Sequence, residues 1–295
     1  MSYIPLHLST PSADMNPLDT MDWADGLAFT SHDVRVGIRV TEASIWPRLI
    51  DRLPPDAAPI PPTVDHIFSI VSNVLFHGFE PILHSVDLDQ LVDVTESSVR
   101  LHVATASQTR LFVHAGVVGW RGRAIVIPAP SRAGKSELVM ALARAGADYY
   151  SDEYAVLDED GLVHPYARPV ALRNADGWTK RRVVIGEMGC AVGSVALPLG
   201  AVVVTRYERD ASWRPRPLSA AEAVLALIAN TVRARLDPPV ALQRLSRAVR
   251  HITAFESARG EAADSAADIL ACCRFPTTAD SLTLRRHDEP VGAPG

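Results

Sequence analysis

Residues 129–136 read Ala-Pro-Ser-Arg-Ala-Gly-Lys-Ser, which matches the phosphate-binding (Walker A) pattern G-x-x-x-x-G-K-[ST] except that Ala129 replaces the first glycine. The apolar run 124–127 leads into this segment, and residues 137–145 follow it with the apolar spacing of a helix. A strand, a loop and a helix in this order present backbone N–H groups and a helix N-terminus to phosphate. The stretch therefore predicts a nucleotide site. The alternative is an ordinary strand–turn–helix with a chance Gly-Lys-Ser.

The roles within this loop follow from the chemistry of phosphate and magnesium. We expect the ammonium group of Lys135 to contact the β- and γ-phosphates of ATP and the hydroxyl of Ser136 to hold Mg²⁺. The full set of residues expected to contact the nucleotide is Ala129, Pro130, Ser131, Arg132, Ala133, Gly134, Lys135, Ser136 and Glu137.

Two further groups flank the loop in sequence. His114 ends the apolar segment 111–113, and the turn at 120–123 returns the chain to the strand before the loop, which predicts a β-hairpin ending beside the phosphates. Asp152 and Glu153 end a short strand after the loop helix, where they could hold Mg²⁺ or take a proton from an attacking hydroxyl. The alternatives are a structural histidine and a simple acidic turn.

Taken together, these three motifs resemble the catalytic domain of the HPr kinase/phosphorylase family, over about residues 110 to 210. That family carries a His-Gly motif, a G-D-S-G-x-G-K-S loop and an Asp-Asp pair after the next helix, at similar intervals. The resemblance implies an α/β fold of the HPr kinase C-terminal domain type, which is a PEP carboxykinase-like P-loop fold. It also implies that Asp152 is the general base toward an acceptor serine, that His114 and Lys135 are catalytic, and that Ser136 and Glu153 lie at the metal.

This sequence departs from the family at several places. Ala115 interrupts the His-Gly pair, the loop lacks two glycines and an acid, and Glu153 replaces the second Asp. The family's Leu-Glu-Ile-Arg-Gly signature survives only as Val-Ala-Leu-Arg at 170–173, so its carboxylate is missing and Arg173 alone remains as a phosphate or acceptor contact. The missing carboxylate argues against the phosphorylase half-reaction.

The whole chain looks more similar to the stand-alone HPr-kinase-like proteins of ribosomal peptide pathways, including lasso peptides. Some of these phosphorylate a side-chain hydroxyl of a precursor peptide. The resemblance implies an ATP- and Mg²⁺-dependent kinase acting on a hydroxyl, a serine of a peptide or small protein. Two other readings remain: a non-catalytic, nucleotide-binding accessory protein, and a PEP carboxykinase-like enzyme, for which no His, Lys and Asp set for Mn²⁺ is recognisable.

Composition sets the class of protein. Of the 295 residues, 47% are hydrophobic and only 6% aromatic, which is typical of Ala- and Val-rich helices packed on a parallel or mixed sheet. A net charge of −5 gives no general electrostatic case for nucleic acid. The three cysteines lack the spacing of a metal site or a disulfide framework. No membrane span or signal peptide is recognisable, so we expect a cytoplasmic protein; a homo-oligomer is left open.

Turn and loop residues divide the chain into five expected segments. These are a weakly ordered start (1–25), an N-terminal α+β region (26–105), a P-loop kinase core (106–215), a C-terminal helical region (216–286) and a disordered tail (287–295). Strands are expected at 34–40, 68–71 and 200–205, and helices at 219–236, 240–255 and 262–273. Arg244, Arg247, Arg250 and His251 form a basic stripe, either a solvated helix face or a contact for an acidic peptide.

Overall fold

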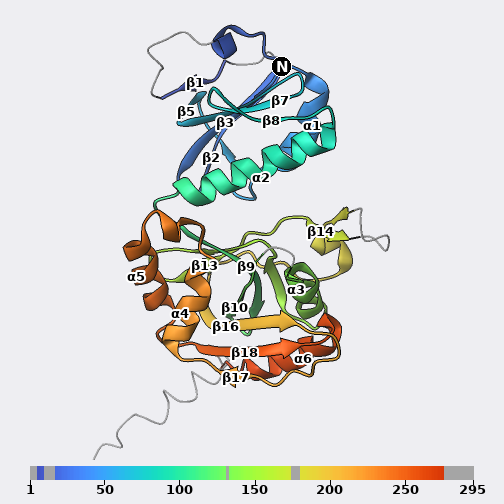
Figure 1. Ribbon diagram of the computed structural model, residues 1–295, viewed down its shortest axis with the longest axis vertical. Coiled ribbons are helices and arrows are strands. Elements are labelled where there is room, and N and C mark those ends of the chain that lie inside the picture. The colour runs from blue at the N-terminus through green and yellow to red at the C-terminus, as the bar shows by residue number, and fades with distance from the viewer. Residues whose placement is uncertain (1–4, 10–16, 131–132, 174–179, 276–295) are drawn as a thin grey trace, which may run out of the picture. The chain divides into compact units, whose positions relative to one another are not determined.

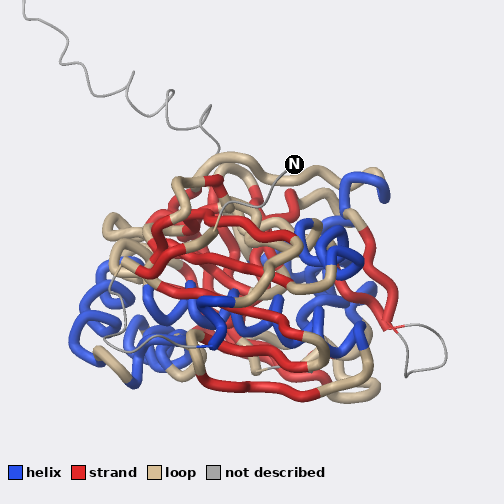
Figure 2. Tube along the Cα trace, turned by 90° about the horizontal axis from the view of Figure 1, so that it is seen from above, coloured by secondary structure: helices blue, strands red, loops and turns tan. Residues whose placement is uncertain are grey.

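The computed structural model describes residues 5–9, 17–130, 133–173 and 180–275, without the side chains of 171–181. The expected tail at 287–295 lies outside these residues. The chain divides into two compact units, Met1–Arg110 and Leu111–Gly295. Both units contain strands and helices, and the two kinds of element are coloured in Figure 2. The structure confirms the mixed α/β class expected from composition.

The first unit is built on a six-stranded sheet in the order β4-β2-β3-β6-β7-β8. Its strands are β2 (Asp25–Ser31), β3 (Val34–Val40), β4 (Ala58–Pro59), β6 (His66–Val71), β7 (Val74–His77) and β8 (Glu80–His84). Only β3 and β6 run parallel. A separate pair joins β1 (His7–Leu8) to β5 (Thr63–Val64), and the short helices are η1 (Pro17–Thr20), η2 (Ala43–Ile45) and α1 (Trp46–Ile50). The expected strands at 34–40 and 68–71 are confirmed.

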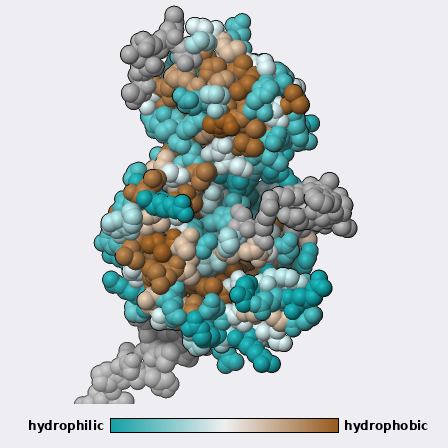
Figure 3. Space-filling view, in the orientation of Figure 1, coloured by the Kyte–Doolittle hydropathy of each residue, from teal (hydrophilic) through white to brown (hydrophobic). Residues whose placement is uncertain are grey.

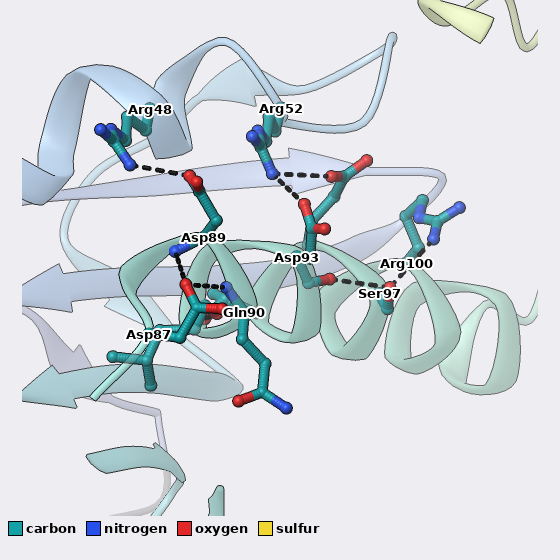
Figure 4. A network of polar contacts seen from close by, with 11 residues as sticks. Arg48, Arg52, Asp87, Asp89, Gln90, Asp93, Ser97 and Arg100 are labelled. Carbon is teal, nitrogen blue, oxygen red and sulfur yellow. Dashed lines mark hydrogen bonds and ion pairs between the residues drawn. The ribbon is translucent and has the colours of Figure 1, made fainter. Parts of the chain in front are cut away.

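The long helix α2 (Leu88–Ala106) lies across this sheet (Figure 1). It begins at Asp87, whose carboxylate accepts hydrogen bonds from the first free backbone N–H groups of the helix, as an N-cap does. Ion pairs connect it to α1 and to the turn that follows α1: Arg48 lies 2.8 Å from Asp89, and Arg52 contacts both Asp93 and Glu96 (Figure 4). Apolar packing and these pairs fix α2 over one face of the sheet.

The second unit is built on an eight-stranded mixed sheet. Its strands are β9 (Leu111–Trp120), β10 (Arg123–Pro128), β11 (Asp148–Ser151), β12 (Tyr154–Leu157), β13 (Leu162–His164), β16 (Leu197–Tyr207), β17 (Arg216–Pro217) and β18 (Thr253–Arg259). A separate hairpin joins β14 (Val170–Arg173) to β15 (Lys180–Val183). The expected hairpin of β9 and β10 is confirmed; both residues of its turn, Arg121 and Gly122, have positive φ angles, which suits a tight hairpin turn.

Helices cover both faces of this second sheet (Figure 1). They are α3 (Lys135–Arg144), α4 (Ala220–Ile228), α5 (Pro238–Ala248) and α6 (Ala262–Cys272), with η3 (Ile185–Met188) and η4 (Val232–Arg235) in the connections. The side chains of β10 alternate between the two faces. Ile125 and Ile127 pack in the cluster with α3 and α6, whereas Ala124 and Val126 pack in the cluster with α4 and α5.

The strands that position the site run parallel. β10 pairs parallel with β16, and β16 pairs parallel with β18, so the carboxyl ends of these three strands point the same way. In open α/β sheets, ligands bind at the carboxyl ends of parallel strands. The loop at 129–134 follows β10 at that edge.

The structure corrects two of the expected helices. The helix with the capping box at Ser219 and Glu222 ends at Ile228 instead of continuing to residue 236. Thr231 forms a bridge to Val113 on β9, which takes the chain out of helical geometry. The helix expected at 240–255 ends at Ala248, and its last residues belong to strand β18. Thr253 and Phe255 are typical of a strand, and residues 253–255 pair with β16.

The surface of the second unit carries apolar residues around α4 and α5 (Figure 3). The large exposed side chains there are Leu225, Leu236, Val240 and Leu242. On the same helix α5, Arg244 and Arg247 of the basic stripe contact the side chain and the carbonyl of Glu159, respectively. Within the described residues, none of the helices is both long and apolar enough to cross a membrane.

Candidate nucleotide site

The loop between β10 and α3 ends at a left-handed glycine. Gly134, at the N-cap of α3, has a φ of 74°, and a Cβ there would lie 2.8 Å from Nη2 of Arg259. This position needs glycine both for its backbone conformation and for the close approach of an arginine. Ala129, by contrast, is not among the residues with positive φ, so its methyl group is tolerated where the pattern has its first glycine. Ser131 and Arg132 lie outside the described residues.

Replacing Gly134 by Ala should therefore destabilise the second unit. A non-glycine residue in this conformation costs about 1–2 kcal/mol, and the new methyl group must also displace the Arg259 guanidinium. The matched control is Gly122→Ala, since Gly122 has a φ of 76° with nothing within 4 Å. We expect Gly134→Ala to lower the unfolding midpoint in urea more than Gly122→Ala does. Equal losses would show that contact with Arg259 is unimportant.

Lys135, the first residue of α3, is buried with its ammonium group turned to the loop. Its Nζ atom lies 3.0 Å from the carbonyl oxygen of Ala129, 2.9 Å from that of Pro130 and 3.2 Å from Nδ1 of His114. Burial lowers the pKa of Lys135, and the negative charges of Glu153 and Asp152 act against that shift. The cation is thus held at the loop mainly by neutral oxygen and nitrogen atoms.

Asp152 lies in the bend between β11 and β12, and both of these strands pair with β9. Oγ of Ser136 donates to its Oδ2 at 2.7 Å, and the hydroxyl of Tyr149 lies 3.1 Å from its Oδ1. Burial raises the pKa of Asp152, with a further rise from the charge of Glu153; the hydrogen bonds from Ser136 and Tyr149 oppose it. A carboxylate with a raised pKa is suited to accept a proton.

His114 and Glu153 complete the polar side of the site. Nε2 of His114 lies 3.5 Å from Oε1 of Glu153. Nδ1 of His114 lies 3.2 Å from the ammonium of Lys135, which can only donate, and 3.0 Å from the carbonyl oxygen of Ala129, which can only accept, so these two contacts call for opposite tautomers of the ring. The register of β9 and β12 produces this arrangement, since His114 pairs directly with Tyr154.

A cavity of about 840 Å³ opens beside the loop. It is lined by the loop, by the carboxyl ends of β16 and β18, and by the end of α4 with Asn230 just after it. Two residues of its lining, Thr205 and Arg259, each carry a buried polar atom, Oγ1 and Nε, without a hydrogen-bond partner among the described residues. The volume lies within the range of small-molecule sites.

Arg259 is a site residue that sequence reasoning missed. It ends β18, is only 3% exposed, and donates from Nη2 to the carbonyl oxygen of Gly134 at 3.1 Å. Tyr149, which contacts Asp152, was also missed. A signal for Arg259 was present in the β-branched and aromatic residues at 252–255, which precede it and are typical of a strand.

The structure thus brings most of the predicted site residues together. Contacts join His114 to Lys135 and to Glu153, and a separate hydrogen bond joins Ser136 to Asp152; the two sets adjoin at the consecutive residues Lys135 and Ser136. The cavity beside the loop is lined by Ala129, Pro130, Ala133, Gly134 and Glu137. Arg173 ends β14, but its side chain lies outside the described residues.

Comparison with known proteins adds little to this geometry. No protein-family model and no curated protein matches the chain. Among solved structures, the chain is similar to the Hpr(Ser) kinase/phosphatase from Coxiella burnetii, with 11% sequence identity over 60% of this chain and 94% of that one. The TM-score is 0.29, and a likeness at this level carries no conclusion about fold or function.

Proposed function

We propose that this chain is an ATP-dependent kinase that transfers the γ-phosphoryl group to a hydroxyl, a serine of a peptide or small protein. The observation that carries the proposal is the placement of Lys135 and Ser136 in the first turn of α3, with Ser136 hydrogen-bonded to Asp152, beside a cavity of about 840 Å³. Phosphoryl transfer needs positioning and charge stabilisation more than covalent chemistry. A buried ammonium, a helix N-terminus and a carboxylate of raised pKa supply these.

The residues present fit both ATP and Mg²⁺. Backbone N–H groups at the start of α3 suit the phosphates, and the cavity between β16, β18 and α4 suits the nucleoside. The oxygen atoms of Ser136 and Glu153 are the ligand type that Mg²⁺ prefers. When bound, Mg²⁺ would neutralise charge on the β- and γ-phosphates.

Each side chain then has a defined task in the proposed reaction. Lys135 stabilises the charge of the transferring group, and Asp152 orients the acceptor hydroxyl and receives its proton. His114 contacts both Lys135 and Glu153, so it holds their positions relative to each other. Tyr149 and Ser136 orient the two oxygen atoms of Asp152.

A second candidate function has one observation in its favour. The ammonium of Lys135 is held by the loop carbonyls of Ala129 and Pro130, an arrangement that also suits a nucleotide-binding protein without turnover. Such an accessory protein would bind ATP and leave it intact.

For the kinase function, the acceptor we propose is the serine of a ribosomal precursor peptide, of the kind that lasso-peptide pathways modify.

Mass spectrometry of acceptors tests the function directly. Purified protein with Mg²⁺ and ATP should add one phosphate to a serine of a short precursor peptide encoded beside this gene. Asp152→Asn protein should add none in the same time. Binding of ATP with neither peptide phosphorylation nor ADP release would favour the accessory protein.

The proposed reaction should run in one direction only. Ala171, on β14, stands where the resembled signature has its carboxylate, so we expect no phosphorolysis. Phosphorylated peptide and inorganic phosphate should release pyrophosphate at a negligible rate compared with the forward transfer. Ala171→Glu is the matched variant: a gain of pyrophosphate release there, and not in the wild type, would support this assignment. Release by the wild type at a rate near that of the forward reaction would contradict it.

A further inference from the structure

Three histidines of the first unit meet over one face of its sheet. His66 lies on β6, His77 on β7 and His102 on α2, and a ring nitrogen from each lies within 4.8 Å of the other two. The pairing register of β6 and β7 explains why His66 and His77 lie on the same face of the sheet. His77 pairs with Phe68, two residues after His66, so both imidazoles project from the same face. His102 adjoins the buried residue Val103 on the helix that covers this sheet.

The packing of these rings leaves one buried ring nitrogen without a hydrogen-bond partner among the described residues. The ring centroids of His66 and His102 are 3.9 Å apart, and those of His77 and His102 are 4.8 Å apart. Nε2 of His102 is buried and has no hydrogen-bond partner among the described residues. A buried nitrogen of this kind costs free energy unless it finds a ligand or a donor.

The electrostatics of the cluster favour neutral rings. Burial lowers the pKa of His66, His77 and His102, in the last case to about 4. The charge of neighbouring imidazoles lowers the pKa of His77 and His102 further, whereas the charge of Asp65 raises that of His66.

We propose that His66, His77 and His102 bind one divalent transition-metal ion, with Zn²⁺ as the principal candidate. Three imidazoles suit Zn²⁺, Ni²⁺, Co²⁺ or Cu²⁺, whereas Mg²⁺ and Ca²⁺ prefer oxygen ligands. Zn–N bonds of about 2.0–2.1 Å in a tetrahedron place the nitrogen atoms about 3.3 Å apart, which a small rotation of the rings from their present spacing achieves. A three-histidine set leaves the fourth position to water or an added ligand.

The ion would connect elements that are far apart in sequence. It would join the C-terminal part of α2 to β6 and β7, at the end opposite the ion pairs with α1 (Figure 4). Binding to the folded state alone raises the unfolding temperature. The site is independent of the proposed kinase reaction, because it lies wholly within the first unit.

Titration of the full-length, chelator-treated protein with Zn²⁺ tests the site. Excess Mg²⁺ is kept in the buffer to occupy oxygen sites. Calorimetry should give one tight equivalent of Zn²⁺, and Co²⁺ should give the visible absorption of a nitrogen-ligated ion of low coordination number. His77→Gln and His102→Asn should each weaken Zn²⁺ binding by more than about 100-fold, because the loss of even an outer partner of a ligand costs 10–100-fold.

Two matched variants keep the test specific. His84→Gln changes an exposed histidine at the end of β8, and His114→Gln changes the histidine of the nucleotide site. Both should bind Zn²⁺ as the wild type does. If a variant of the three histidines does not fold, the Co²⁺ spectrum of the wild type still shows whether the protein binds the ion through nitrogen ligands. Absence of a tight equivalent, or its loss in His114→Gln, would overturn the proposal and leave the three rings as an aromatic cluster around Phe68.

Discussion

Asp152→Asn should lower the rate of peptide phosphorylation by about 10²–10⁴-fold, the usual contribution of a general base, while leaving ATP affinity within a few-fold. The amide keeps the size of the side chain and can still accept a hydrogen bond from Ser136 or Tyr149, but it cannot take a proton from the acceptor hydroxyl. Steady-state rates together with calorimetric titration of Mg²⁺ and ATP separate the two effects.

The matched control is Asp148→Asn on the same strand. Asp148 begins β11 with its side chain exposed, so both rate and affinity should stay at wild-type values. A fully active Asp152→Asn enzyme would refute the role of Asp152 and leave Glu153 or the substrate phosphate as the proton acceptor. Loss of ATP binding would instead place Asp152 among the Mg²⁺ ligands, next to Ser136 at 2.7 Å.

The role of Asp152 as general base also determines in which direction the activity changes with pH. A general base works only when deprotonated, so activity falls as the pH drops through its pKa. Because burial raises the pKa of Asp152, this fall should begin at a higher pH than for an exposed aspartate. The acid limb of the kcat/KM profile should disappear in Asp152→Asn, and its persistence there would assign the limb to another group.

Lys135→Ala should damage both binding and turnover. The side chain is 8% exposed and its ammonium group lies at the centre of the loop. Removing one preorganised donor from a reacting oxyanion costs about 10²–10³-fold in turnover. The phosphates of bound ATP also lose the positive charge of the Lys135 ammonium, which weakens binding before any reaction occurs. We therefore expect a lower kcat together with a weaker affinity for ATP, measured by single-turnover kinetics and calorimetry.

Arg144→Ala is the control for a lost positive charge on the same helix. Arg144 ends α3 with an exposed side chain, one helix length away from the loop, and its loss should change neither quantity. Equal effects of the two substitutions would show that Lys135 acts only through the net charge of the helix. If the affinity for ATP were unchanged in Lys135→Ala, the assignment of the phosphates to this loop would be wrong.

The local part of the site could be predicted from sequence. The β9–β10 hairpin, the loop and α3 follow from turn residues and apolar spacing within a short stretch, and the structure has them in that order. The capping box at Ser219 likewise marks the start of α4, because both of its hydrogen bonds join neighbours in sequence.

The parts that depend on distant pairing could not be predicted. Arg259 contacts the carbonyl of Gly134, 125 residues earlier, and it reaches that position only because β18 pairs with β16. Residues 252–255 are typical of a strand, but no local pattern shows that β18 pairs with β16. His66, His77 and His102 come from two strands and a helix, and no local spacing of metal ligands indicates their meeting.

Amide hydrogen exchange, followed by mass spectrometry, tests the central claim that the loop before α3 binds the phosphates of ATP. The account predicts that Mg²⁺ and ATP slow exchange in peptides covering residues 129–138 and the end of β18 near Arg259, and that Lys135→Ala reduces this protection. It predicts no change at β7 or α2 in the first unit. Unchanged exchange at 129–138 under saturating Mg²⁺ and ATP, or protection confined to other segments, would contradict it.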